Sequence, residues 1–424
     1  MRAGVMAPEG RKRPSACSQE AGGMATKSNR SQPAHAVALW ALAVVIYLLG
    51  LWVPAAHAQT NNTSEPAGTN AVSKFRSSDD GWFDASSVLE EKYGFIPIPL
   101  IITEPAVGYG GGVGLMFLSK PLPQAENGLG RPNITVAGGF GTENGSWGAV
   151  AGDMRYWLDQ HLQTLVGFVY ASVNLDYFGV GNDPALANNP QRYNLQPKGG
   201  TARAKYRFGD TRLWAGLNYA LASTEVSFDK PPGTPGQPAF RHESIVGGFT
   251  PSLNFDTRDN FFTPNRGTYL EASAGFFSPA FGADQNFQRA GLLAMQFVPL
   301  SPTLFLGVRA EGAASFGNEP FYLRPFISLR GAATLRYQGE EVAQIETELR
   351  WQFWKRFSLV GFVGGGAAWN HFEHFDSTKT IVTGGAGFRY ELARAYGLHM
   401  GLDVARGPDD TAVYIQIGSA WARP

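Results

Sequence analysis

Few side chains in the sequence have the types and spacing that a reaction or a metal site requires. His371 and His374 lie beside Glu373 and Asp376, a spacing that could hold a metal ion. Histidines in a polar loop are more often ordinary surface residues. Gly108–Gly114 opens no helix, so it fits a strand better than a phosphate loop, and no hydrolase, P-loop or cysteine motif occurs in a fitting context. We therefore predict no enzyme activity, no cofactor and no metal site.

Acids and arginines alternate in a second polar segment, which lies between two strand-like stretches within Ser252–Phe277. Asp256 and Asp259 can accept hydrogen bonds from backbone N–H groups, while Arg258 and Arg266 neutralise their charge. A calcium site on the two aspartates is the alternative. We predict a structural role, because this set of charges is suited to holding a tight turn.

The stretches on both sides of this turn alternate between apolar and polar or small residues. After the turn, one face carries Leu270, Ala272, Ala274 and Phe276, and the other carries Glu271, Ser273 and Gly275. Strict alternation with an apolar face is typical of a transmembrane β-hairpin.

The same alternation recurs along the chain and predicts an all-β fold, a transmembrane antiparallel β-barrel of about 16 strands, with about 12–14 as the alternative. The predicted strands are 95–103, 107–118, 133–142, 146–158, 161–173, 200–208, 212–222, the two of the hairpin, 287–298, 303–315, 343–353, 357–369, 380–391, 398–406 and 411–421. Three long connections, 174–199, 223–242 and 316–341, follow odd-numbered strands, so we expect them on the outer side. The connection 119–132 is longer than a periplasmic turn should be.

The composition agrees with a membrane barrel. The 424 residues include 52 Gly, 29 Phe, 15 Tyr and 10 Trp, and only 17% are charged. A soluble domain usually carries about 25% charged residues, so lipid-facing strands explain the low value. Lys and Arg (35) balance Asp and Glu (35), so no basic excess would attract nucleic acid.

The N-terminal segment has the features of an export signal. Ala38–Val53 is the only long apolar run, and Ala56–Ala58 follows it as a small-x-small cleavage site. An uncleaved anchor is the alternative, and Met24 would make a more ordinary start. Cys17 lies in this segment, so we expect no disulfide in the mature chain. The chain then divides into a signal peptide (1–58), a periplasmic linker (59–92) and the barrel (93–424).

Charged residues within the predicted strands share one face. Glu346, Glu348 and Arg350 alternate with apolar residues, and Asp403 does so in a later strand. A lysine or arginine on the lipid face costs about 2–4 kcal/mol near the midplane, so we expect strand charges to line the lumen. A soluble double sandwich is the alternative, but its outer faces would be less uniformly apolar.

Three motifs resemble the bacterial surface antigen superfamily, which includes BamA/TamA-type outer-membrane assembly factors and two-partner secretion transporters. The first is the turn signature D-x-R-D…P-x-R-G, carried here by Asp256, Arg258, Asp259, Pro264, Arg266 and Gly267. The second is Ser328–Gly331 (SLRG), which is similar to the V-R-G-[FY] loop motif of the family. Glu348–Arg350 and Leu402–Gly407 resemble its closing strands, and the resemblance covers roughly Tyr93–Trp421.

By this resemblance, Arg330 and Gly331 belong to a loop that folds into the lumen. A guanidinium buried there needs carboxylate partners. The candidates, which alternation places on the lumenal face, are Glu346, Glu348 and Asp403. Gly364 replaces the acid that the family often carries on strand 13, and Ala332 replaces the usual loop aromatic, so the partners must come from other strands. A solvated surface position for Arg330 is the alternative.

The resemblance also implies a weakly paired seam between the first and last strands. Pro97 and Pro99 of the first strand cannot donate to a ladder, and Trp421 could serve as the terminal aromatic of the last strand. Family members usually carry periplasmic POTRA domains before the barrel, and Gln59–Lys92 has no room for one.

The implied function is insertion or translocation of polypeptide, or of lipid, at the bacterial outer membrane. Expected partners are outer-membrane lipids, lipopolysaccharide, and unfolded outer-membrane or secreted proteins. The alternatives are a passive or gated pore, and a structural surface-antigen barrel with binding loops at Asn174–Gly199 and Ser223–His242.

Overall fold

The computed structural model describes residues 75–77, 79–90, 95–102, 109–118, 131–178, 190–228, 241–333, 335–371, 379–408 and 411–421. The predicted signal peptide and much of the predicted linker lie outside these residues. Within the described part of the chain, no helix is both long and apolar enough to cross a bilayer.

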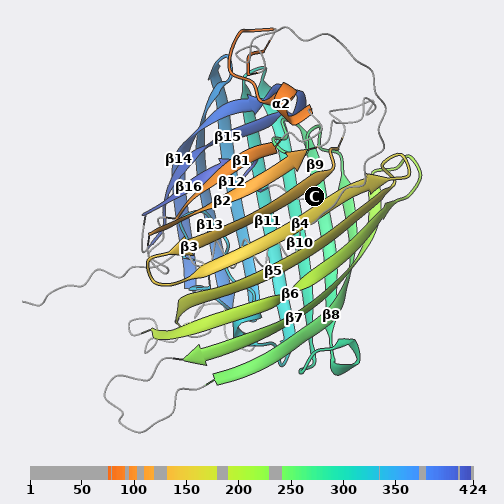
Figure 1. Cartoon of the computed structure of the whole chain (residues 1–424), viewed down its shortest axis with the longest axis vertical. Helices are drawn as coiled ribbons and strands as arrows, with labels where there is room; N and C mark the ends of the chain where they lie inside the picture. The colour runs from red at the N-terminus through yellow and green to blue at the C-terminus, as the bar shows by residue number, and fades with distance from the viewer. Residues whose placement is uncertain are drawn as a thin grey trace, which may run out of the picture. The chain divides into compact units, whose positions relative to one another are not determined.

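Sixteen strands form one antiparallel sheet in which each strand pairs with its neighbours in the chain (Figure 1). A short helix, α2 (Ser86–Glu90), precedes them. The strands are β1 (Phe95–Ile102), β2 (Gly110–Leu118), β3 (Ile134–Thr142), β4 (Trp147–Trp157), β5 (Leu162–Tyr177), β6 (Gln191–Arg207), β7 (Leu213–Phe228), β8 (Arg241–Asp256), β9 (Gly267–Phe277), β10 (Phe287–Ser301), β11 (Leu304–Gly317), β12 (Glu341–Trp354), β13 (Phe357–Trp369), β14 (Lys379–Ala393), β15 (Leu398–Arg406) and β16 (Thr411–Ile417). The predicted 16-stranded barrel is confirmed.

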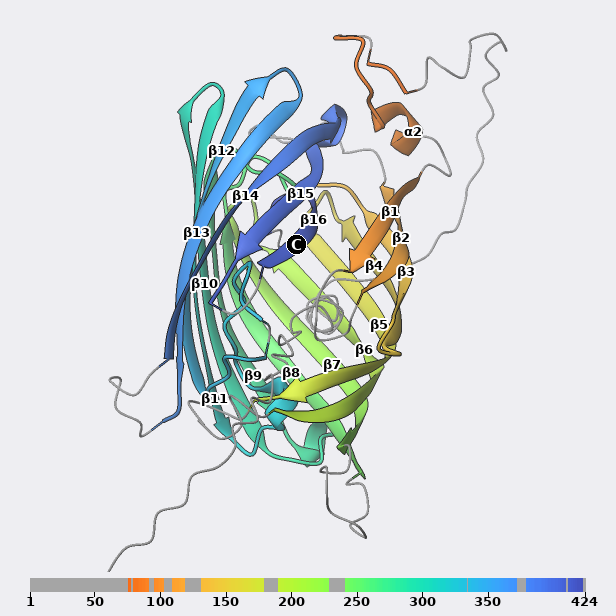
Figure 2. The same cartoon turned by 90° about the vertical axis from the view of Figure 1, so that its left-hand side faces the viewer.

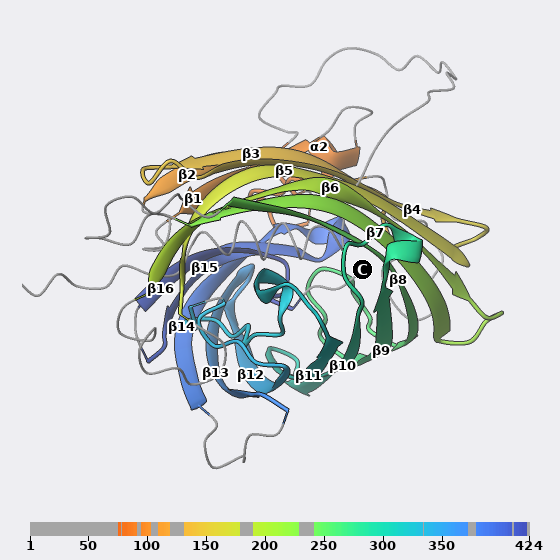
Figure 3. The ribbon, with the colours of Figure 1, turned by 90° about the horizontal axis from the view of Figure 1, so that it is seen from below.

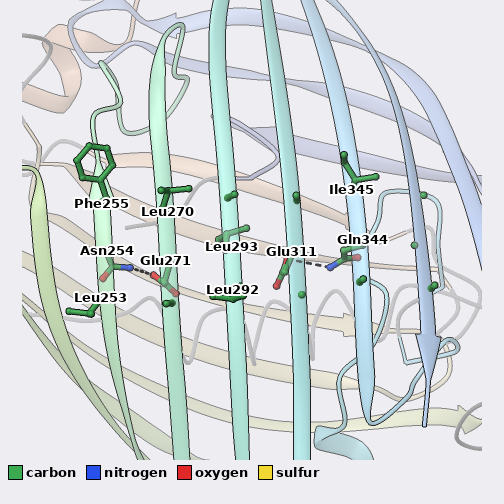
Figure 4. Close-up of a pocket in the computed structure, with 18 of the residues that line it drawn as sticks. Leu253, Asn254, Phe255, Leu270, Glu271, Leu292, Leu293, Glu311, Gln344 and Ile345 are labelled. Atoms are coloured by element: carbon green, nitrogen blue, oxygen red, sulfur yellow. Dashed lines mark hydrogen bonds between the residues drawn. The ribbon is translucent and has the colours of Figure 1, made fainter. Parts of the chain in front are cut away.

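The two faces of the central strands differ as the alternation predicts. Leu270, Leu292 and Ile345 are 45, 66 and 51% exposed and lie on the outer face of β9, β10 and β12 (Figure 4). A hollow of about 810 Å³ lies here, lined mainly by apolar and small residues. On the inner face, Gln344 Nε2 donates to Glu311 Oε2 at 3.3 Å. The sheet therefore has an apolar outer surface and a polar lumen.

Some strand charges do not face the lumen as expected, and one such pair lies in β4. Asp153 of β4 lies opposite the exposed Val166 of β5, so it points outward together with Arg155. Arg155 Nε lies 2.6 Å from Asp153 Oδ2, and Thr135 Oγ1 donates to Asp153 Oδ1 at 2.7 Å. The pair is tolerated because its charges neutralise each other close to the end of the strand.

Two segments that alternation predicts as long loops belong in part to strands, which corrects their expected bounds. β5 and β6 include 174–177 and 191–199, and β7 and β8 include 223–228 and 241–242. The two proposed binding loops therefore begin and end in sheet, and each is shorter than expected.

The alternation in these extensions has the opposite sense, with apolar residues inside and polar residues outside. The buried apolar residues, which form one cluster, include Val173, Leu175, Tyr193, Leu195 and Val226. On the outer side, Asn194 Nδ2 donates to Asn174 Oδ1 at 2.8 Å. A rule that requires an apolar outer face misses such strands, because they extend beyond the apolar band of the barrel.

Candidate functional site: the lumenal loop and the β1–β16 seam

The connection between β11 and β12, residues 318–340, folds back inside the ring of strands (Figure 3, blue-green). Ile327 and Leu329 are buried against apolar residues of β12, β13 and β14. Gly364 and Gly366 of β13 leave the space they need, because a Cβ atom there would lie 3.0 Å from Leu329 and 2.8 Å from Ile327. Apolar packing on a glycine-rich strand thus seats the loop on the wall.

The tip of this loop places Arg330 among its three predicted partners. Arg330 Nε lies 2.9 Å from Glu346 Oε1, and Nη1 lies 2.7 Å from Glu348 Oε2 and 2.9 Å from Asp403 Oδ2. Arg330 is 5% exposed, Glu346 2% and Asp403 0%, so these ion pairs are shielded from water. Carboxylates of β12 and β15 therefore take the place of the strand 13 acid.

We call Arg330, Arg389, Glu346, Glu348 and Asp403 the Arg330 cluster. Two further contacts hold it together. Arg389 of β14 binds Asp403 in a bidentate manner, with Nη1–Oδ1 and Nη2–Oδ2 distances of 2.5 and 2.8 Å. The Arg330 guanidinium lies on the Phe362 ring, with Cζ 3.6 Å from the centroid. Burial disfavours its charge, but the surrounding carboxylates outweigh burial and raise the pKa of Arg330. Arg330 is therefore a fixed cation that anchors the loop.

The residues beside Arg330 attach the loop to different parts of the wall. The Gly331 N–H donates to the Tyr414 hydroxyl of β16 at 2.8 Å, and the Ser328 N–H donates to Gln344 Oε1 of β12 at 2.7 Å. Gly331 has a φ of +87°, which glycine adopts without strain. The loop tip thus joins β12 to β16, the last strand of the sheet.

The predicted turn motif lies between β8 and β9, at the end of the barrel that we call the turn rim. Asp256 Oδ1 accepts hydrogen bonds from the backbone N–H and the Nε of Arg258, each at 3.0 Å. Arg131, which precedes β3, places Nη2 2.7 Å from Asp256 Oδ2. Both oxygens of Asp256 face cations, so the arrangement suits a structural turn and not a calcium ion.

The rest of the motif closes the turn. Asp259 Oδ1 accepts a hydrogen bond from the Arg266 N–H at 3.3 Å, and Pro264 is buried. Gly267 has a φ of +109°, and a Cβ atom there would lie only 2.4 Å from the Thr257 carbonyl oxygen. Each residue of the motif thus contributes to the shape of the turn, and none is presented for chemistry.

Trp421 lies in the lumen and not in the last strand, which corrects its expected place at the seam. β16 ends at Ile417, and the residues after it turn inward. The Ser419 N–H donates to the Phe262 carbonyl oxygen at 2.5 Å, and the buried Trp421 indole N–H donates to Glu346. The C-terminal segment therefore reaches the Arg330 cluster. An aromatic residue near the C-terminus fits either place, so the sequence did not distinguish them.

β1 and β16 are the two edges of the sheet, and the described residues show no pairing between them (Figure 2). These strands have 8 and 7 residues, whereas β5 to β8 have 16 or 17. Pro97 and Pro99 lie in β1, and neither has an N–H to offer to another strand. The seam is therefore the least bonded line in the described wall.

Residues 79–90, which we call the strap, dock on the turn rim. Arg356, in the turn between β12 and β13, is 0% exposed. Its Nε lies 2.7 Å from Asp80 Oδ2, and its Nη1 lies 2.8 Å from Asp84 Oδ2. Trp82 packs edge-on against two aromatic rings of β12 and β13, at 5.0 and 5.6 Å between centroids. The described part of the predicted linker is thus attached to the barrel.

The strap also contacts both sides of the seam. Leu89 of α2 is buried in an apolar cluster that includes Ile96 of β1 and Met116 of β2. The same cluster includes Leu398, the first residue of β15, and Ile417 of β16 packs against it. The strap therefore spans the seam at the turn rim.

Sequence reasoning missed the strap and its anchor, although a signal was present. Trp82 stands between Asp80 and Asp84, and Arg356 occupies a two-residue strand connection. Two acids that flank an aromatic residue predict a partner surface with a basic and an aromatic residue, but nothing in the sequence identifies those residues.

Replacing Arg356 with glutamine should release the strap and leave the barrel folded. Asp80 and Asp84 would lose the cation that they share, and an uncompensated buried carboxylate, here that of Asp84, is unfavourable. We expect amide exchange in residues 79–90 to become at least about tenfold faster, which corresponds to about 1.4 kcal/mol. Exchange in β8 and β9 should not change. The matched control is Arg394→Gln, because Arg394 also contacts Asp80, at 3.2 Å, but is partly exposed. Equal protection of the strap in wild type and Arg356→Gln would contradict this role.

Docking of the strap should depend on pH in the acid range. The hydrogen bonds from Arg356 lower the pKa of Asp80 from 3.8 to about 2. Because the docked pKa is the lower one, Asp80 stabilises docking above about pH 4, and this stabilisation is lost as the pH falls towards about 2. A nitroxide label at Asp79→Cys should gain mobility over that range. The gain should be absent in Asp80→Asn, and a constant spectrum in the wild-type background would refute the assignment.

Of the residues considered for a metal site, His371 lies just after β13. Its Nδ1 is 2.9 Å from Glu341 Oε1. His374, Glu373 and Asp376 lie outside the described residues. Within the part that is described, no three metal-ligating side chains come together.

Comparisons with known proteins add to these observations. The Omp85 superfamily domain matches residues 127–408. Similar solved structures include CdiB from Escherichia coli, with 12% identity, a TM-score of 0.52, and coverage of 76% of this chain and 61% of that one. They also include BamA from Haemophilus ducreyi lacking POTRA domains 1-3, with 13% identity, a TM-score of 0.48, and coverage of 76% of this chain and 68% of that one. CdiB from Acinetobacter baumannii has 10% identity and a TM-score of 0.48, with coverage of 76% of this chain and 58% of that one. A search of curated proteins finds no match.

The two kinds of match carry different weight. At 12% identity, the likeness to CdiB shows the fold alone, and this chain spans only 61 and 58% of the two CdiB chains. The family match covers more than half of the 424 residues and includes the turn motif, the loop tip and the Arg330 cluster. The chain therefore belongs to the Omp85 superfamily of outer-membrane β-barrels.

Proposed function

We propose that this barrel inserts polypeptide into the outer membrane, or translocates it across, by opening the seam between β1 and β16. The turn rim would face the periplasm, where the strap would meet unfolded outer-membrane or secreted proteins. Surrounding phospholipid and lipopolysaccharide would be its other partners. The proposal requires no covalent chemistry.

The observation that carries the proposal is the unpaired seam. Interior strands are held on two edges, whereas β1 and β16 show ladder hydrogen bonds on one edge only within the described residues. Exposed strand edges are templates on which another strand can pair. An incoming strand could therefore add to β1 or β16 without first breaking a ladder.

The lumen disfavours the alternative of a passive pore. Residues 318–340 lie inside the barrel, and their tip is tied to β12 and β16. The C-terminal segment also points inward, with Trp421 buried against the inner wall. A passive pore would require the 318–340 loop and the C-terminal segment to leave the lumen, whereas the seam can open while both stay in place.

Reconstitution separates the two functions. Liposomes that contain the purified barrel should speed the folding of a urea-unfolded eight-stranded outer-membrane barrel severalfold over empty liposomes. In planar bilayers the same preparation should show only low or transient conductance. A stable porin-like conductance, together with no acceleration of folding and unchanged outer-membrane protein levels in a deletion strain, would reject insertion in favour of a pore.

A further inference from the structure

Residues 75–77 and 79–84 form a short hairpin at the turn rim, which we call the rim hairpin. The Ser77 N–H donates to the Trp82 carbonyl oxygen at 2.9 Å, and the Asp84 N–H donates to the Phe75 carbonyl oxygen at 3.0 Å. Gly81 has a φ of +70°, which glycine adopts without strain where the hairpin turns. The first part of the strap therefore has backbone pairing of its own.

The rim hairpin lies on the outer side of the wall. Phe357 shares its face of β13 with Leu359, which is 45% exposed. Trp82 packs edge-on against Phe357, with 5.6 Å between the ring centroids. The hydroxyl of Tyr390, which pairs with Phe357 across β13 and β14, donates to the Phe83 carbonyl oxygen at 2.6 Å. Outward-facing residues of β13 and β14 thus hold the hairpin.

The rim hairpin has one acidic side and one aromatic side. Asp80 and Asp84 are turned towards the barrel, where both bind Arg356. Phe75 and Phe83 are 44 and 47% exposed, and their rings stack with 5.7 Å between centroids. Exposed apolar surface of this kind marks a contact site. The aromatic side is therefore the part of the hairpin that a partner would cover.

Exposed aromatic residues also surround the wall at this end of the barrel. They lie at or just beyond the turn-rim ends of β4, β6 and β12, and they are Trp157, Tyr206, Phe208, Trp351, Phe353 and Trp354. In membrane barrels such girdles mark the level of the lipid headgroups. Trp82 packs edge-on against Trp354, with 5.0 Å between centroids. The rim hairpin therefore continues the lipid-facing surface of the barrel.

A basic side chain lies between the hairpin and this girdle. Lys355 Nζ is 5.1 Å from the centroid of the Trp82 ring and 5.6 Å from that of Trp354. A lysine at the edge of an apolar band places its ammonium group among the headgroups while its stem covers apolar surface. Aromatic rings beside a cation are typical of segments that lie in a membrane interface.

We propose that the rim hairpin lies in the headgroup region of the bilayer at the turn rim, and that phospholipid covers Phe75 and Phe83. The strap would then be held by Arg356 on one side and by lipid on the other. This contact goes beyond the insertion function, because it requires neither a protein client nor an open seam.

The depth of two spin labels tests this contact. Phe75→Cys and Phe83→Cys, each in a Cys17→Ser background, carry a nitroxide in phosphatidylcholine liposomes. Collision with oxygen relative to a nickel chelate should place both labels about 5–10 Å into the boundary between headgroups and acyl chains. Leu292→Cys, on the outer face of β10, is the lipid-facing reference. The control on the same hairpin is Asp79→Cys, whose native side chain is 70% exposed and which should stay accessible to the chelate.

Each outcome decides the matter. Protection of both phenylalanine positions in the absence of client, with none at Asp79, supports the lipid contact. Accessibility equal to that at Asp79 overturns it. Protection that appears only after a urea-unfolded outer-membrane barrel is added also overturns it, because a protein client then covers the rings. If one labelled variant lacks heat-modifiable mobility, the other decides. No step needs insertion activity, so loss of that activity leaves the depths unchanged.

Discussion

Replacing Arg330 with alanine is expected to destabilise the barrel by about 3–5 kcal/mol, the cost of removing one partner from a buried ion pair. Three carboxylates would lose a shared cation, and two of them are almost fully buried. The loop would also lose its contact with Phe362. The measurement is the free energy of unfolding in guanidinium, followed by the loss of heat-modifiable gel mobility.

Two other variants separate charge from geometry. Arg330→Lys keeps the charge, but an ammonium group lacks the planar fork that contacts several carboxylate oxygens. We therefore expect a loss of stability between those of wild type and Arg330→Ala. Arg192→Ala removes an arginine that is 59% exposed and 3.9 Å from Asp176, and a pair of this kind contributes at most about 1 kcal/mol. Equal stability of Arg330→Ala and Arg192→Ala would show that Arg330 does not brace the lumen.

Replacing Gly331 with alanine should unseat the loop tip. The left-handed backbone costs an alanine about 1–2 kcal/mol. The added Cβ would also lie 2.9 Å from the Arg406 carbonyl carbon and 3.0 Å from the Gly407 nitrogen. These contacts are with strand backbone, which cannot move aside, so overpacking adds about 1–3 kcal/mol. The expected result is lower stability and faster trypsin cleavage after Arg330, which is buried in the wild-type protein.

Two glycines serve as matched controls for this substitution. Gly209 also has a positive φ, of +52°, but a Cβ there would meet nothing within 4 Å, so Gly209→Ala isolates the backbone strain. Gly361 has neither a positive φ nor a close neighbour, so Gly361→Ala should be nearly neutral. If Gly331→Ala lowers the stability of the barrel no more than Gly209→Ala does, the close approach of the loop to β15 does not contribute to that stability.

The sequence predicted the fold where one physical pattern acts alone. In β13 the outer face is apolar along the whole strand, in β15 it is apolar up to the last residue, Arg406, and both strands have the predicted bounds. The ends of β5 to β8 were mistaken for loops because a strand that leaves the membrane exchanges the polarity of its faces. Asn174 and Asn194 look like loop residues unless Val173 and Leu195 are known to pack inside.

The candidate site was predictable only in part, for a related reason. Arg330 and its carboxylates follow from charge balance, since a lumenal cation must be paired and alternation shows which acids face inward. The contacts of Trp421 and of the strap could not be predicted, because these residues lie in chain segments that have no repeating sequence pattern. Their partners, Glu346 and Arg356, are 75 and 276 residues away from Trp421 and Asp80, and no local rule reaches that far.

The central claim is that the seam must open, and locking it tests that claim most directly. Pro99→Cys on β1 and Val413→Cys on β16 place thiols on exposed positions of the two edges, and a series of bismaleimides of increasing length is used to join them. The control is Leu402→Cys/Ile415→Cys, which joins the paired strands β15 and β16. The rate to measure is the folding of the eight-stranded reporter barrel in liposomes. We predict that the seam cross-link lowers it to the rate of empty liposomes, while the control cross-link leaves it unchanged. Undiminished folding with the seam locked would contradict the account.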